Sequence, residues 1–154
     1  MSRPGQPSPD YVPLIALVHR LSRALQLDMA HEANRRGHHG IKNSHNVVFA
    51  TLDPDGSRAS DMAAQAGMTR QSMGEIVREL VDLDIVEMRP DPTDRRAKLV
   101  TWTPHGLDVA REGYQHILEV EDRYAKELGA EQLAWLREAL VRMTAMLDES
   151  SDRG

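Results

Sequence analysis

Residues 60–78 read Ser60-Asp-Met-Ala-Ala-Gln-Ala-Gly67-Met-Thr69-Arg-Gln-Ser-Met-Gly-Glu-Ile-Val-Arg78, the pattern of two helices joined by a tight turn. Ser60 can cap a first helix over 61–66, and Gly67 can adopt the positive φ that ends it. Thr69 can cap a second helix over 70–83, and Ala63 is small enough for the two helices to cross closely. The apolar residues that face back from the second helix are Met68, Met73, Ile76, Val77 and Leu80. The stretch therefore predicts a helix-turn-helix.

The outer face of the second predicted helix is polar. Its members are Arg70, Gln71, Gly74, Glu75 and Arg78. Side chains near the start of such a helix can reach base edges in the major groove of DNA. An ordinary helical hairpin with a glycine cap has the same local pattern, so these residues alone leave both interpretations open.

A β-hairpin is predicted directly after the helix-turn-helix. Residues 86–89 and 97–102 have the composition of two short strands, and the polar stretch 91–96 between them that of a turn. Its tip, Asp94-Arg95-Arg96, presents adjacent guanidinium groups, and Asp94 can pair with one of them and fix its direction. Arginine on a narrow projection suits the minor groove of DNA, where negative potential is concentrated. A solvated charged turn is the alternative.

Long amphipathic helices are predicted at both ends of the chain. One covers 13–36, and a shorter helix over 43–52 precedes a turn at 53–56. Thr103 can cap another helix that begins with Pro104 and is interrupted at Gly129. A heptad-like apolar seam follows: Leu133, Leu136, Leu140, Met143 and Leu147. The apolar positions of Trp102 and Trp135 predict packing in the core. The fold class is mainly α with a small β-hairpin wing, and the unpaired seam predicts a two-fold homodimer.

Composition excludes several classes of protein. Cysteine is absent, which excludes disulfides and thiol catalysis, and no run of apolar residues is long enough for a transmembrane helix. No catalytic motif or nucleotide-binding loop occurs, so we expect no enzyme, catalytic residue or cofactor, and a cytoplasmic protein without membrane contact. The net charge of −5 argues against nucleic acid, but residues 104–154 account for it, while 58–103 carry −1.

Taken together, these motifs resemble the MarR (multiple antibiotic resistance regulator) family of winged helix-turn-helix transcription factors. The resemblance depends on Ser60-Asp-Met-Ala-Ala-Gln-Ala-Gly67, Thr69-Arg-Gln-Ser72, Arg89-Pro-Asp-Pro-Thr-Asp-Arg-Arg-Ala-Lys-Leu-Val100 and Thr103-Pro-His-Gly106, and it extends from Pro13 to Glu149. It implies a flexible tail at 1–12, a helical dimerisation region at 13–36 and 104–149, and a winged DNA-binding lobe at 42–103.

The resemblance also implies a function. Such a homodimer binds a pseudo-palindromic operator in double-stranded DNA, and it represses a gene until a small, often phenolic, ligand releases it. Arg70, Gln71 and Ser72 would open the recognition helix, and Gly74, Glu75 and Arg78 would continue it. Asp94, Arg95, Arg96 and Lys98 would form the DNA-contacting part of the wing. The family commonly has a small hydroxyl residue at Gly74, a basic residue at Glu75 and glycine at Asp84, so the operator sequence stays open.

Two further expectations concern small ligands. By the family layout, the pocket for an aromatic ligand would be lined by Leu25, Met29, His45 and Phe49. The chain has seven histidines, but their spacing forms no local metal-binding pair, so no metal site is predicted and a metal-responsive regulator is an alternative. A winged-helix module that binds protein and not DNA is another alternative, supported by the acidic balance and by Glu75.

Overall fold

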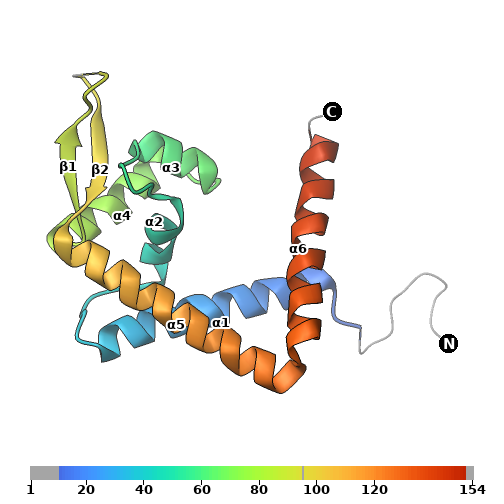
Figure 1. Cartoon of the computed structure of the whole chain (residues 1–154). Helices are drawn as coiled ribbons and strands as arrows, with labels where there is room; N and C mark the ends of the chain where they lie inside the picture. The colour runs from blue at the N-terminus through green and yellow to red at the C-terminus, as the bar shows by residue number, and fades with distance from the viewer. Residues whose placement is uncertain (1–10, 95, 152–154) are drawn as a thin grey trace. The chain divides into compact units, whose positions relative to one another are not determined.

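The computed structural model describes residues 11–94 and 96–151 of the chain (Figure 1). Helices and strands follow in the order α1 (Leu14–Arg35), a 3-10 turn (Asn43–His45), α2 (Asn46–Thr51), α3 (Ala59–Gln65), α4 (Arg70–Asp82), β1 (Val86–Pro90), β2 (Lys98–Trp102), α5 (Pro104–Leu128) and α6 (Ala130–Ser151). The fold is mainly α with one antiparallel hairpin, as the sequence predicted. The chain divides into two compact units, Met1–Gly113 and Tyr114–Gly154, whose boundary lies within α5.

The helix-turn-helix is closed by hydrogen bonds at the end of α3. Gly67 has φ +64°, and the N–H groups of Gly67 and Met68 donate to the carbonyls of Ala64 and Ala63 at 3.2 and 2.9 Å. This is the double bond pattern of a Schellman motif. Thr69 then caps α4, since its hydroxyl accepts from the N–H of Ser72 at 3.1 Å. The predicted roles of Gly67 and Thr69 are confirmed.

The start of α3 differs from the prediction. Ser60 lies inside the helix, and Arg58 occupies the cap position, where its carbonyl accepts from the N–H groups of Asp61 and Met62. The physical reason is a contact distant in sequence: the neighbouring Ser57 forms a two-way backbone bridge to Val100 of β2. This bridge keeps the chain extended as far as Arg58. The helix therefore begins at Ala59, before the predicted start at Asp61.

The backbone at the end of α4 accommodates Asp84, where the family that the motifs resemble commonly has glycine. Asp84 stands where glycine is common and has φ +55°, the left-handed conformation that aspartate tolerates better than most side chains. Its N–H donates to the carbonyl of Val81, and the N–H of Ile85 donates to that of Leu80. Asp84 therefore ends α4 in the way that Gly67 ends α3.

The wing is a twisted pair of five-residue strands, joined to α4 through a short turn (Figure 1). The register pairs Val86 with Trp102 and Pro90 with Lys98. Compared with the predicted strands, Pro90 is included and Ala97 is not. Val86 of β1 and Val100 of β2 are buried, and they join the core of the first unit.

One core holds the winged lobe together. Its largest fully buried side chains are Met62, Met73, Leu80, Ile85, His45, Val48, Val86 and Val100. Of the predicted inner face of α4, Met73, Val77 and Leu80 are buried, while Ile76 packs against them half-buried. The predicted helix at 43–52 is divided into the 3-10 turn and α2, whereas the helix predicted at 13–36 is α1 within one residue at each end.

The second unit combines most of α5 with α6. Gly129, at φ +96°, separates the two helices, and Arg137 of α6 donates to Glu121 of α5 at 2.9 Å. The prediction that Trp135 packs in the core is wrong for the single chain, because its side chain is 69% exposed. Val141, Met146 and Leu147 of α6 are also largely exposed. None of the helices in the described ranges is long and apolar enough to span a bilayer.

Candidate nucleic-acid interface

The polar face of α4 lies on the surface of the first unit, as predicted. Arg70, Gln71, Glu75 and Arg78 are exposed. Ser72 and Gly74 are half-buried. The hydroxyl of Ser72 lies 2.8 Å from that of Thr69. Because the helix begins at Arg70, both Arg70 and Gln71 occupy its first turn. The face therefore offers guanidinium, amide and carboxylate groups to a partner.

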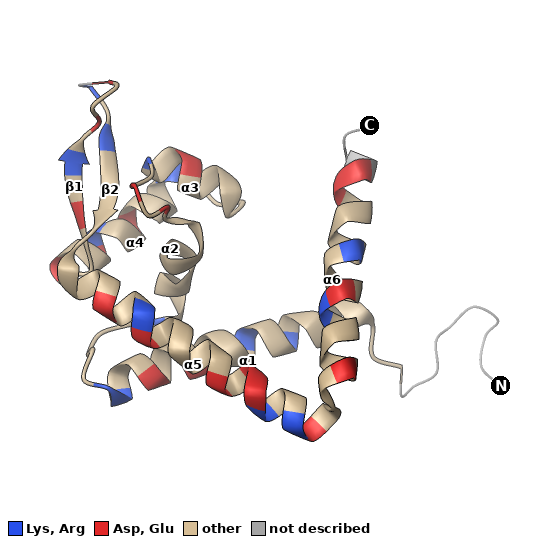
Figure 2. Ribbon diagram, in the orientation of Figure 1, with Lys and Arg blue, Asp and Glu red and all other residues tan. Residues whose placement is uncertain are grey.

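Basic residues also lie along the outer part of the wing. Both strands carry blue segments towards the end with the turn (Figure 2), and the register places Arg89 on β1 and Lys98 on β2 there. Both are exposed, as is Arg96 within the turn. Arg89 was not among the predicted site residues, although its place on the hairpin is as prominent as that of Lys98. Arg95 lies outside the described residues.

Asp94 orders the tip through the backbone. Its carboxylate accepts from the N–H of Arg96 at 3.0 Å, and its carbonyl accepts from the N–H of Ala97 at 2.9 Å. The sequence predicted that Asp94 pairs with the guanidinium of a neighbouring arginine. In the case of Arg96, the Asp94 carboxylate bonds the main-chain N–H and not the side chain. The turn positions the backbone of Arg96 and leaves its side chain exposed.

A second aspartate anchors the turn end of the wing to the residue that caps α3. Asp91 is 4% exposed, and one oxygen of its carboxylate accepts from Nε and Nη2 of Arg58, at 2.8 and 2.5 Å. The other oxygen accepts from the hydroxyl and the N–H of Thr93, at 2.7 and 2.8 Å. Sequence reasoning missed Arg58, because it lies 33 residues from its partner and nothing local distinguishes it from a solvated arginine.

This anchor makes the stability of the lobe depend on pH. The bonds from Thr93 and then Arg58 lower the pKa of Asp91 from 3.8 to about 2. A lowered pKa in the folded state stabilises the protein above pH 3.8, and this contribution is lost as the pH falls towards 2. We expect the free energy of unfolding, measured in urea at several pH values, to fall less steeply in this range for Asp91→Asn than for the wild type. Parallel curves would show that the anchor does not act.

The residues predicted to line a ligand pocket all belong to the first unit. Leu25, Met29 and Phe49 are half-buried, and the Phe49 ring lies 5.4 Å from that of Trp102. His45 is fully buried, and both its ring nitrogens are engaged: Nδ1 accepts from the N–H of Lys42, and Nε2 lies 2.8 Å from Glu79. His45 therefore serves the packing of α4 and could offer a ligand only its ring carbons.

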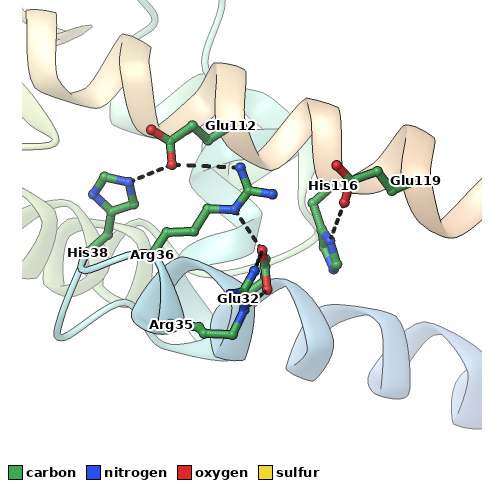
Figure 3. A network of polar contacts seen from close by, with 7 residues as sticks. All are labelled: Glu32, Arg35, Arg36, His38, Glu112, His116 and Glu119. Atoms are coloured by element: carbon green, nitrogen blue, oxygen red, sulfur yellow. Dashed lines mark hydrogen bonds and ion pairs between the residues drawn. The ribbon is translucent and has the colours of Figure 1, made fainter.

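A polar network joins the end of α1 to the start of α5 in the first unit (Figure 3). Arg35 and Arg36 both donate to Glu32 at 2.6 Å and hold its pKa at about 2. Arg36 and His38 approach Glu112 of α5 at 4.0 and 3.0 Å. In the second unit, His116 lies 3.6 Å from Glu119. Within 11–94 and 96–151, no three His, Asp or Glu side chains are arranged to hold a metal ion.

Solved structures include transcriptional regulators with this arrangement of helices and wing. SlyA superposes with a TM-score of 0.73 at 15% identity, over 90% of this chain and 96% of its own. MarR from E. coli gives 0.68 at 18% identity, over 87% and 98%. MepR from S. aureus, solved in complex with DNA, gives 0.69 at 16% identity, over 89% and 99%. In sequence, no family model and no curated protein matches. The chain thus has the MarR-like winged-helix fold that its motifs predicted.

Proposed function

We propose that this chain is a DNA-binding transcriptional regulator of the MarR family that acts as a homodimer. The observation that carries the proposal is the position of two exposed elements on one compact unit: the polar face of α4 and a wing with Arg89, Arg96 and Lys98. A helix of this kind fits the major groove, and a basic projection beside it fits the minor groove. The DNA complex of MepR, which has the same fold, supports this role.

The dimer is supported by apolar surface that a single chain leaves uncovered. Leu14, Ile15 and Leu17 at the start of α1 are 47–80% exposed, and Trp135 and Leu147 of α6 are each 69% exposed. Large apolar side chains left exposed along a helix are typical of an interface when they form a patch. We propose that residues 13–36 and 104–149 bind those of a second copy, and that each copy presents one lobe, 42–103, to one half of a pseudo-palindromic operator.

The rest of the proposal follows from the family resemblance. The dimer would act in the cytoplasm without catalysing a reaction, as a repressor that a small phenolic or other aromatic ligand releases from DNA. Leu25, Met29 and Phe49 are the proposed pocket residues, with the buried ring of His45 behind them. A protein-interaction module is the second candidate, because Glu75 places a negative charge on the exposed face of α4.

Replacing Arg96 by alanine should weaken binding to operator and to random DNA alike. An exposed arginine on the wing contributes charge to the minor groove, where base pairs differ mainly in groove width and potential. The slope of log affinity against log salt concentration should become shallower by about one unit, because one phosphate contact is lost. Fluorescence anisotropy at four salt concentrations measures the affinity and this slope. An unchanged affinity and slope in a folded variant would exclude the wing from the interface.

Replacing Arg70 by alanine should instead reduce discrimination. An arginine in the first turn of a recognition helix can bond both acceptors of guanine, a contact that contributes about 1–3 kcal/mol of specificity. Operator affinity should therefore fall about tenfold or more, while affinity for random DNA changes far less. Equal losses on both DNAs would mean that Arg70 contacts only phosphate.

The proposed function is tested by a gel shift with the DNA upstream of the chain's own gene, at low and at physiological salt. A regulator should give a discrete shift that survives excess random DNA and weakens steeply with salt, because neutralised phosphates release their counterions. No specific shift on that DNA or on neighbouring control regions would favour the interaction module.

A further inference from the structure

We propose that Gln71 and Glu75 act as one reading unit that selects cytosine at one position of each operator half-site. This inference rests on the proposed function and specifies what the recognition helix reads. Both side chains are exposed on α4, four residues apart, on the face that would enter the groove. Nε2 of Gln71 donates to Oε1 of Glu75 at 3.2 Å.

That hydrogen bond determines which atoms remain for a partner. One N–H of the Gln71 amide is used, so its carbonyl oxygen and second N–H remain, together with Oε2 of Glu75. The bond also directs the Glu75 side chain along the helix, towards Gln71. The unit therefore presents two acceptors and one donor, with a full negative charge on the Glu75 carboxylate.

The negative charge limits what the unit can contact. A carboxylate accepts hydrogen bonds only and is repelled by phosphate, so Glu75 can be tolerated in the groove only opposite a donor. In the major groove, guanine and thymine present acceptors, whereas cytosine and adenine present an amino group. The adenine amino group has the N7 acceptor beside it, which suits an amide better than a carboxylate. Cytosine N4 is therefore the best match for Glu75.

Gly74 gives independent support for close approach at this place. A Cβ at this position would have only Nη1 of Arg78 within 4 Å, at 3.8 Å, so the fold itself does not require glycine. Glycine within a helix is less favourable than alanine. Its presence between Gln71 and Glu75 keeps the backbone of α4 open where a base edge would approach. Packing within the chain therefore does not account for glycine at this position.

The test is selection of duplexes from a random pool by the full-length protein, followed by affinity measurements on single base-pair changes. The wild type should enrich a motif with one cytosine position in each half-site. Glu75→Gln should lower the preference for cytosine at that position about tenfold and shift it towards adenine, which an amide reads, while other positions persist. Asp82→Asn, which removes a negative charge from the far end of α4, is the matched control and should leave the motif unchanged.

Gly74→Ala provides a second readout. Its thermal midpoint should rise by a few degrees, since alanine favours the helix, while its affinity falls more for the selected motif than for random DNA. A motif that Glu75→Gln leaves unchanged in every position would overturn this inference and leave the proposed function standing. A wild-type protein that enriches no motif would overturn the proposed function, and this inference with it.

Discussion

Changing both Leu140 and Leu147 to glutamate is expected to convert the protein into a folded monomer that binds operator DNA at least a hundredfold more weakly. The two side chains belong to the apolar seam of α6 and are 37% and 69% exposed in the single chain, so a carboxylate at either position can reach solvent in the isolated unit. In the proposed interface, the same charges would be buried without partners. A monomer also loses the gain from engaging two half-sites together, which is about 10²–10⁴ in affinity.

The control for this pair is on the same helix. Ala134 and Ala145 are exposed and point away from the seam at 100° per residue, so changing both to glutamate adds the same charge elsewhere. That variant should remain a dimer. Sedimentation velocity at micromolar concentration, with circular dichroism for folding, separates the two. A seam variant that sediments as the wild type does would exclude α6 from the interface, and a folded wild-type monomer would exclude the dimer.

Changing Gly106 to alanine is expected to destabilise the winged lobe by about 3 kcal/mol or more, near the upper end of single-residue effects. A Cβ at this position would lie 1.9 Å from the carbonyl oxygen of Ile85 and 2.8 Å from its carbonyl carbon. Neither atom can move freely, because the Ile85 oxygen accepts from the N–H of Thr103 and the Thr103 hydroxyl bonds both Asp84 and Gly106. The clash would separate the base of the wing from α5.

Gly113 is the matched control for this substitution. It lies on the same helix, but a Cβ there would meet only the end of the Met29 side chain, at 3.3 Å, which can shift. Gly113→Ala should therefore stay within about 1 kcal/mol of the wild type. Urea unfolding followed by circular dichroism gives the midpoint and the slope for all three proteins. Similar midpoints for Gly106→Ala and the wild type would contradict the close packing at Ile85.

The features that sequence predicted well are those whose cause is local. Gly67 ends α3 and Thr69 begins α4 through bonds to residues within four or five positions, so composition alone reveals them. The wing anchor between Arg58 and Asp91 and the bridge from Ser57 to Val100 connect residues far apart in the chain. No local pattern encodes such a contact, and for this reason the sequence predicts Ser60 as the cap of α3 where the structure has Arg58. A different limit applies to Asp94: its partner, the main-chain N–H of Arg96, is two residues away, but the bond depends on the turn that forms.

Hydroxyl-radical footprinting on the selected operator is the sharpest test of a two-lobed dimer on DNA, because the radical attacks the deoxyribose and so reports where the backbone and the minor groove are covered along both strands. Two lobes that each place α4 in a major groove and a wing in the adjacent minor groove predict protection with two-fold symmetry. The half-sites should be centred about one helical turn apart, or a multiple of that, with flanking minor-groove protection that disappears in Arg96→Ala. A single asymmetric footprint would contradict the two-fold arrangement, and minor-groove protection that persists without the Arg96 side chain would contradict the role of the wing.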